Sequence, residues 1–357
     1  MMQQDPRQLE YIRRQQAQRL AARRRAEAIR RERIRRARRN RAILRLVLVV
    51  LLIVGVVTVV SLVRSCAKDK SVIPQRILPT SNSENALSAL EKYPAYADDK
   101  ADISSECVLL VDLTNDEVVC EKNSAQSVRI ASLTKIMTAI VAIENLDDLN
   151  STYIFSQDII DYLTEQNSAV AGFKAGEEVR AIDLLYAAML PSGGDGAMGI
   201  ADLVGSSQQG FVDMMNQKAV SLGMTRTHFT NATGFDEGEN YSCAYDVSLM
   251  FEYALNNEMF CEIISTPEYT TYPTKEHPDG LTFKSTVYRG FDVNHLEVEG
   301  ILGGKTGFTT DAGLCLVTYA EQNGNEYMLI TLGAGSGSNY PQYHFYDAEK
   351  LYSAFVE

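Results

Sequence analysis

The spacing of apolar residues separates a membrane-like segment from the rest of the chain. Leu46 to Val63 form an 18-residue apolar run that one glycine and two small hydroxyl residues interrupt. As a helix this run would extend about 27 Å, close to the thickness of the hydrocarbon core of a bilayer. It has no charged face, which argues against a buried helix of a soluble protein. The pattern therefore predicts a transmembrane segment over residues 46–65.

Beyond residue 102 the pattern changes between strands and helices. Two β-rich runs predict a first hairpin, and two more, joined by the turn-forming residues 322–325, predict a second. Apolar residues at helical spacing predict helices, and Asp246 is expected to cap a further helix. Strands near both ends with helices between them predict an α+β fold in which the N- and C-terminal pieces share one sheet. The predicted strands are 107–112, 117–121, 314–320 and 326–332, and the predicted helices are 130–143, 181–190, 211–222 and 345–355.

Charge is distributed unequally around the apolar run. Residues 1–45 carry 16 Arg and four acidic residues, which leaves 18 basic and 42 acidic side chains for the remainder. An excess of Arg before a membrane segment favours a cytoplasmic N-terminus. The basic region is about three times longer than that of a cleaved signal peptide and no Ala-x-Ala site follows, so an uncleaved anchor is expected. We expect an Arg-rich cytoplasmic tail at 1–45, a transmembrane signal anchor at 46–65, an extracytoplasmic stalk at 66–102 and a folded domain at 103–357.

The Arg-rich tail raises the question of a nucleic-acid partner. A basic segment directly before a membrane span is typical of a tail that rests on anionic lipid. We therefore expect membrane lipid as its partner and no nucleic acid.

Ser132 and Lys135 lie at the start of the predicted helix 130–143. At this spacing their side chains project from the same face of the helix. A hydroxyl beside an amine can form an activated nucleophile. The same spacing recurs at Ser65 and Lys68, where no buried helix supports it, so the pair alone is weak evidence of a site.

Two further groups of residues support a site around Ser132. Ser192 lies in a Pro-Ser-Gly-Gly turn directly after the apolar helix 181–190. Lys305, Thr306 and Gly307 lie in a strand-like run, where glycines allow the backbone a close approach. These groups place a second hydroxyl and a second cation in the same region of the chain.

The motifs Ser-x-x-Lys, Ser-x-Gly and Lys-Thr-Gly, in this order, resemble those of the serine-type D-alanyl-D-alanine carboxypeptidases, which are low-molecular-mass penicillin-binding proteins. The resemblance extends over about residues 103–356 and includes the blocks 130–138, 184–193, 211–219 and 222–229. It implies a β-lactamase/DD-peptidase-like fold, in which helices flank a mostly antiparallel sheet. The active site would lie between the edge of the sheet and an all-helical cluster.

The resemblance also implies a role for each catalytic residue. Ser132 would attack the peptide carbonyl and form an acyl-enzyme, with Lys135 as its base. Lys135 can act only when neutral, and burial together with the charge of Lys305 is expected to lower its pKa. Ser192 would pass a proton to the leaving amine.

Substrate binding is assigned to a second set of residues by the same resemblance. Lys305, Thr306 and Gly307 would bind the terminal carboxylate of the substrate. The backbone N–H groups of Ser132 and Phe308 would form the oxyanion hole.

The implied function is that of a membrane-anchored D,D-carboxypeptidase that removes the terminal D-alanine from peptidoglycan stem peptides. Its location would be a bacterial cell membrane, crossed once, and β-lactams would be covalent inhibitors. No cofactor and no metal are expected, because the four histidines lack the spacing of metal ligands. Two alternatives remain open: a D,D-endopeptidase that cuts cross-links, and a catalytically weak protein that binds or organises the cell wall.

The sequence departs from the family pattern at identifiable positions. Gly194 occupies the place of an asparagine in the second motif, where it is a candidate contributor to the site. Asn240 stands where a histidine is common. No C-terminal β-domain or amphipathic anchor is expected after residue 357, so the apolar run would serve as the anchor. Pairing of the six cysteines is left open, although Cys107 and Cys120 flank the first hairpin.

Overall fold

The computed structural model describes residues 102–335 and 342–356. The predicted tail and membrane segment, and the stalk up to residue 101, lie outside these residues. Within the described ranges, no helix has both the length and the apolar character needed to cross a membrane.

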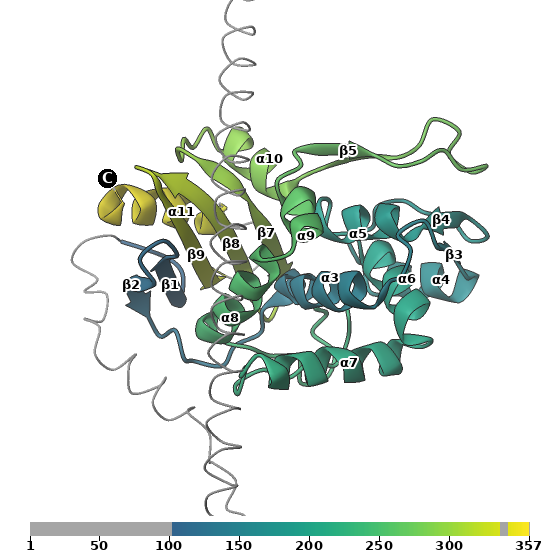
Figure 1. Cartoon of the computed structure of the whole chain (residues 1–357), viewed down its shortest axis with the longest axis horizontal. Coiled ribbons are helices and arrows are strands. Elements are labelled where there is room, and N and C mark those ends of the chain that lie inside the picture. Colours follow the sequence, from purple (N-terminus) through teal and green to yellow (C-terminus); the bar gives the residue numbers. More distant parts are fainter. Residues whose placement is uncertain (1–101, 336–341, 357) are drawn as a thin grey trace, which may run out of the picture. The chain divides into compact units, whose positions relative to one another are not determined.

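A five-stranded antiparallel sheet forms the centre of the fold, with strand order β2-β1-β9-β8-β7. The N-terminal hairpin pairs with the C-terminal strands through β1 and β9, so the prediction that the two ends share one sheet is confirmed. The strand β7 lies at one edge (Figure 1). The bounds are β1 Cys107–Asp112, β2 Glu117–Lys122, β7 Ile301–Thr309, β8 Gly313–Gln322 and β9 Asn325–Ala334.

Helices cover both faces of this sheet (Figure 1). One face carries the 3₁₀ turn η1 (Ala131–Leu133) and a helical cluster, and the other carries α11 (Tyr343–Phe355) and α10 (Thr286–Val293). Two short hairpins, β3–β4 and β5–β6, lie outside the main sheet. The cluster consists of α3 Thr134–Asn145, α4 Gln157–Glu165, α5 Ala181–Met189, α6 Gly194–Gly205, α7 Gln208–Ser221, α8 Ala244–Leu255 and α9 Glu258–Ile264, and the hairpin strands are β3 Thr152–Ile154, β4 Glu178–Arg180, β5 Glu268–Thr270 and β6 Thr282–Lys284.

The alternation of side chains along β1 explains the two layers. Cys107 and Leu109 belong to the core beneath the helical cluster, whereas Val108 and Leu110 belong to the core beneath α11. Successive side chains of a strand point to opposite faces, so a strand buried on both faces is apolar throughout. Burial of a residue such as Leu109 contributes about 1.5–3 kcal/mol, which stabilises β1 between the two layers.

Two expectations about local structure need correction or completion. Asp246 is not the cap of its helix: the N-cap of α8 is Cys243, and Asp246 lies in the first turn. Its carboxylate instead accepts hydrogen bonds from Arg226 N and Thr227 Oγ1, both at 2.7 Å. Cys120 is paired across the hairpin with Leu110 rather than with Cys107, and Cys107, Cys120, Cys243 and Cys315 are free thiols.

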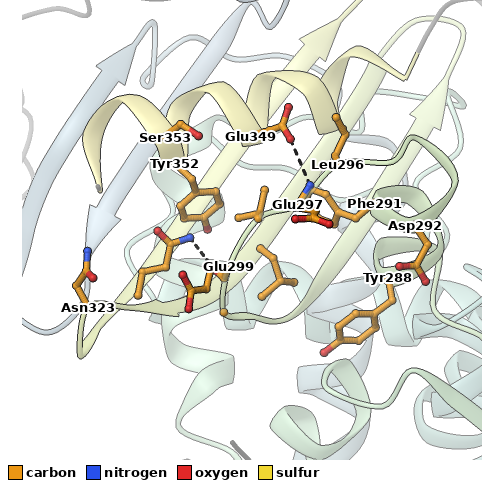
Figure 2. Close-up of a pocket in the computed structure, with 14 residues that line it drawn as sticks. Tyr288, Phe291, Asp292, Leu296, Glu297, Glu299, Asn323, Glu349, Tyr352 and Ser353 are labelled. Carbon is orange, nitrogen blue, oxygen red and sulfur yellow. Dashed lines mark hydrogen bonds between the residues drawn. The ribbon is translucent and has the colours of Figure 1, made fainter. Parts of the chain in front are cut away.

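A cavity of about 900 Å³ opens beside α11. Figure 2 shows Tyr352 and Glu349 of α11 above it, with Glu297 and Glu299 from the connection that precedes β7. The floor belongs to the core beneath α11, and no predicted site residue lines the cavity. This cavity is therefore distinct from the predicted site, which lies on the opposite face of the sheet.

Candidate active site

Ser132 lies in the 3₁₀ turn η1, directly before α3. The helix begins at Thr134, so Lys135 is in its first turn and reaches back to the serine. Lys135 Nζ donates a hydrogen bond to Ser132 Oγ at 2.9 Å. Ala131, immediately before the serine, has a φ of 47°, and such a left-handed conformation costs a non-glycine residue about 1–3 kcal/mol. Strain of this kind persists only where the surrounding structure maintains it, and it is common at functional sites.

Lys135 is held in an almost dry environment. Its side chain is 2% exposed, and Nζ also donates to Thr233 O at 2.7 Å. Burial lowers the pKa of Lys135 to about 7, since water no longer stabilises the ammonium ion, while the Asp195 carboxylate acts in the opposite direction. Near neutral pH a substantial fraction of Lys135 is therefore neutral and able to accept a proton from Ser132.

The loop that holds Lys135 was not predicted from the sequence. Asn231 Oδ1 accepts hydrogen bonds from the backbone N–H groups of Thr233, Gly234 and Phe235 at 2.7–3.2 Å. Gly234 has a φ of 86°, and a Cβ at this position would overlap Ala131 O. The loop thus lies directly against the backbone that precedes Ser132. The local signal was an asparagine followed closely by a glycine, which is typical of a turn, but its contact with Lys135 is set by the tertiary fold.

Ser192 and Lys305 form the second part of the site. Ser192 lies in the turn between α5 and α6 with a φ of 64°. Lys305 Nζ donates to Ser192 Oγ at 2.7 Å and to Thr306 O at 2.8 Å. Burial, followed by the charge of Lys135, lowers the pKa of Lys305 well below its usual value. The amine of Lys305 is therefore close enough to Lys135 to be affected by its charge.

The edge strand β7 carries the third motif against the turn η1 that holds Ser132. A Cβ at Gly307 would lie 3.1 Å from Ser132 N and from Ile130 O, so a side chain here would crowd the turn. Thr306 Oγ1 lies 2.7 Å from Thr286 Oγ1. Phe308 is 38% exposed beside them. The structure therefore brings Ser132, Lys135, Ser192, Lys305, Thr306 and Gly307 together, while the oxyanion role of the Ser132 and Phe308 N–H groups stays a prediction.

Gly194 begins α6, and its backbone N–H donates to Ala169 O at 2.7 Å. A Cβ on Gly194 would collide with Ser168 Oγ and Leu163 Cδ2. A side chain at this position would therefore require the ends of the Ser168 and Leu163 side chains to move.

Asp195 is a second residue whose role the sequence did not indicate. Its carboxylate is fully buried and accepts backbone hydrogen bonds from Ala171, Gly172, Phe173 and Gly196 at 2.8–3.3 Å. It also lies in the first turn of α6, where a negative charge is favourable. Asp195 therefore fixes the loop beside Gly194 and provides the negative charge that acts on the amine of Lys135.

Asn240 is buried near the start of α3. Its Nδ2 donates a long hydrogen bond of 3.3 Å to Thr134 Oγ1. The residue therefore contacts Thr134, which lies between Ser132 and Lys135 in the chain.

Comparison with known proteins agrees with this geometry. A family model described as D-alanyl-D-alanine carboxypeptidase matches residues 94–336. The chain is 26% identical over 232 residues to a D-alanyl-D-alanine carboxypeptidase of Bacillus subtilis, covering 65% of this chain and 58% of that protein. It is 29% identical over 255 residues to a D-alanyl-D-alanine endopeptidase of Pseudomonas aeruginosa, and the match covers 70% of this chain and 76% of that protein. The chain thus spans less than two thirds of the Bacillus relative.

A solved structure supports the assignment of the fold. The DD-transpeptidase of Streptomyces superposes with a TM-score of 0.64 at 28% identity, covering 72% of this chain and 98% of that structure. The predicted DD-peptidase fold, an antiparallel sheet with flanking helices, is confirmed.

Proposed function

The chain belongs to the D-alanyl-D-alanine carboxypeptidase family, and from this premise we propose that it is a serine D,D-carboxypeptidase. Its substrate would be the stem peptide of peptidoglycan, from which it removes the terminal D-alanine. The observation that carries this proposal is the 2.9 Å hydrogen bond between Lys135 Nζ and Ser132 Oγ, with the pKa of the buried amine lowered to about 7.

Acylation begins when neutral Lys135 accepts the hydroxyl proton of Ser132. The Ser132 oxygen attacks the carbonyl carbon of the penultimate D-alanine and forms a tetrahedral intermediate with a negative oxygen. Backbone N–H groups of Ser132 and Phe308 stabilise that oxygen, and one such donor contributes about 3–4 kcal/mol in other serine enzymes. Burial prepares Lys135 for this step before the substrate arrives, so no desolvation of the base is needed during the reaction.

Collapse of the intermediate breaks the C–N bond, and the amine of the terminal D-alanine must gain a proton as it leaves. Ser192 delivers this proton, since its hydroxyl is held by Lys305 at 2.7 Å. Lys135 then passes the proton that it took from Ser132 to Ser192, which restores the Ser192 hydroxyl. Water then hydrolyses the ester on Ser132, releases the shortened stem peptide and restores the hydroxyl.

Recognition of the substrate carboxylate falls to Lys305 and Thr306 on β7. Gly307 allows this strand to approach the nucleophile turn closely enough to contact a peptide that lies along it. The same groups would hold the carboxylate of a β-lactam, whose strained amide acylates Ser132 and releases no separate leaving group. Penicillins are therefore expected to bind covalently.

We also propose that the catalytic domain is held outside a bacterial cell membrane by the apolar run 46–65. Sequence features support this arrangement: the length of the run, the 16 Arg before it and the acidic composition after it. Membrane lipid would then be the partner of the N-terminal segment.

Labelling with a fluorescent penicillin tests the proposed chemistry. The wild-type protein should become covalently labelled at one site, and Ser132→Ala should abolish labelling, since Ser132 is the proposed nucleophile, whereas Ser192 beside Lys305 is assigned only the proton-delivery step. Ser65→Ala is the matched control, because Ser65 begins the second Ser-x-x-Lys of the sequence. If the wild-type protein folds but is never labelled by the penicillin, the proposal is refuted.

An endopeptidase activity is the second candidate, and the similarity of this chain to the Pseudomonas endopeptidase supports it. Digestion of purified cell wall, followed by mass spectrometry of the products, separates the two. A carboxypeptidase releases free D-alanine and leaves cross-linked dimers intact, whereas an endopeptidase converts dimers to monomers. Failure to release either product, with penicillin labelling retained, would point to a catalytically weak wall-binding protein.

A further inference from the structure

Thr286 lies where the second and third motifs meet, although it belongs to neither. Its hydroxyl is 2.7 Å from that of Thr306 on β7. Its backbone N–H donates to Leu190 O at 3.0 Å, and Leu190 directly precedes the turn that carries Ser192. Thr286 is also the first residue of α10, with the buried Ser285 as N-cap. Its hydroxyl is therefore positioned by contacts with both sides of the site.

Lys305 already uses N–H groups in hydrogen bonds within the protein, so carboxylate binding depends more on the nearby hydroxyl of Thr306. An ammonium group has three N–H donors, and Lys305 directs two of its own to Ser192 Oγ and Thr306 O. Burial and the neighbouring Lys135 also reduce the tendency of Lys305 to carry a charge. A substrate carboxylate at β7 therefore depends substantially on the hydroxyl of Thr306.

A hydroxyl group has one proton to donate. If Thr306 donates its proton to Thr286, none is available for a carboxylate. If Thr286 donates instead, the proton of Thr306 is free to point toward the substrate. A hydrogen bond to an ionised acceptor is stronger than one between neutral groups, so a bound carboxylate favours the second arrangement. The donated bond from Thr286 then strengthens the bond from Thr306, because successive hydrogen bonds polarise one another.

We propose that Thr286 is a positioning residue for recognition of the substrate's C-terminal carboxylate, acting through Thr306. It donates its hydroxyl proton to Thr306 Oγ1 and thereby directs the single proton of Thr306 to the ligand. This inference rests on the proposed function. Its consequence is a preference for substrates that end in a free carboxylate, which favours the carboxypeptidase reaction over cleavage of an internal peptide bond.

The test compares benzylpenicillin with its methyl ester, which lacks the carboxylate charge. For each compound, acylation is separated into the dissociation constant of the first complex and the first-order rate constant of acylation. Thr286→Val should weaken binding of benzylpenicillin about tenfold and leave its acylation rate constant within about twofold, since the reacting groups are untouched. Reaction with the ester should be unchanged. Thr286→Ser, which restores the hydroxyl, should behave as wild type.

Thr282→Val provides a matched control. Thr282 and Thr270 form another hydroxyl pair, at 2.9 Å, on the exposed β5–β6 hairpin. This variant should leave both compounds unaffected. The inference is overturned if Thr286→Val binds benzylpenicillin as wild type does, or if acid and ester lose reactivity by the same factor, which indicates a structural role. A wild-type protein that benzylpenicillin does not acylate refutes the proposed function itself, so the two failures are distinguishable.

Discussion

Replacement of Lys135 by methionine should stabilise the fold while it abolishes acylation. Lys135 is fully enclosed, and an unbranched methionine fills a similar volume without a charge. The variant therefore removes the cost of burying the amine and retains most of its packing. A residue that lowers stability in exchange for reactivity is expected where catalysis requires a desolvated base.

The pKa of Lys135 gives the magnitude. A decrease from 10.5 to about 7 corresponds to about 5 kcal/mol of destabilisation when the amine is protonated in both states, and about 4 kcal/mol at pH 7. Against this, Thr233 O loses its donor, which costs about 1–3 kcal/mol for a buried carbonyl. Ser132 is only partly buried and can bond to water instead. The net gain is about 1–3 kcal/mol at pH 7.

The gain should depend on pH with a definite sign. Between pH 7 and 10.5 the unfolded wild-type chain binds more protons at this lysine than the folded protein does, so wild-type stability rises with pH. Below about pH 7 the full penalty is present. The stability difference between Lys135→Met and wild type should therefore be largest at or below pH 7 and shrink toward pH 10.

Thermal and urea unfolding at pH 6, 7.5 and 9 measure the difference. At pH 7.5 the melting temperature of Lys135→Met should lie roughly 2–10 °C above that of wild type. Lys284→Met, at an exposed lysine, is the control and should show no comparable gain. The reasoning is refuted if Lys135→Met is less stable than wild type at pH 6, or if the difference does not change with pH.

Three further outcomes follow from the site geometry. The benzylpenicillin acylation rate of wild type should rise about tenfold per pH unit below pH 7 and level off above it, because only neutral Lys135 accepts the proton; a flat profile from pH 5 to 8 would contradict this. Gly234→Ala should slow acylation at least tenfold and lower the free energy of unfolding by about 2–4 kcal/mol, since the new Cβ would overlap Ala131 O. Gly223→Ala is the control: Gly223 also has a positive φ, of 77°, but the space around it is open, so this variant should affect stability only modestly. Asp195→Asn should move the acid limb of the acylation profile to lower pH. The Asp195 carboxylate raises the pKa of Lys135, so removal of its charge lowers that pKa. An acid limb that stays at the same pH would exclude this electrostatic role.

Much of this fold could be predicted because its signals are local. Alternating and turn-forming residues predicted the two hairpins, and the structure extends them to β8 Gly313–Gln322 and β9 Asn325–Ala334. Helical periodicity predicted α3, α5, α7 and α11 within a few residues. Asp246 was assigned to the wrong position in its helix because Asp is a frequent cap, while the actual cap, Cys243, is an uncommon one.

The remaining parts of the site depend on contacts between distant residues. Thr233 lies 98 residues from Lys135, and its contribution is a backbone carbonyl, which no side-chain pattern reveals. Thr286 is an ordinary threonine at a helix start until the sheet places Thr306 beside it. The Pro-Ser-Gly-Gly segment correctly predicted a turn at Ser192, but the sequence did not show that α6 begins two residues later.

The packing around Gly194 constrains the order in which this site can change by mutation. Gly194→Asn alone would place new atoms where Ser168 and Leu163 already lie. Prior substitution of Ser168 by glycine and of Leu163 by a smaller residue would open that space at the cost of packing against α6. The effects of these substitutions should therefore be strongly non-additive, since the three positions share one volume. The asparagine of the family pattern could enter this position only if the ends of the Ser168 and Leu163 side chains move aside, so the effect of Gly194→Asn on stability should depend on which residues stand at those two positions.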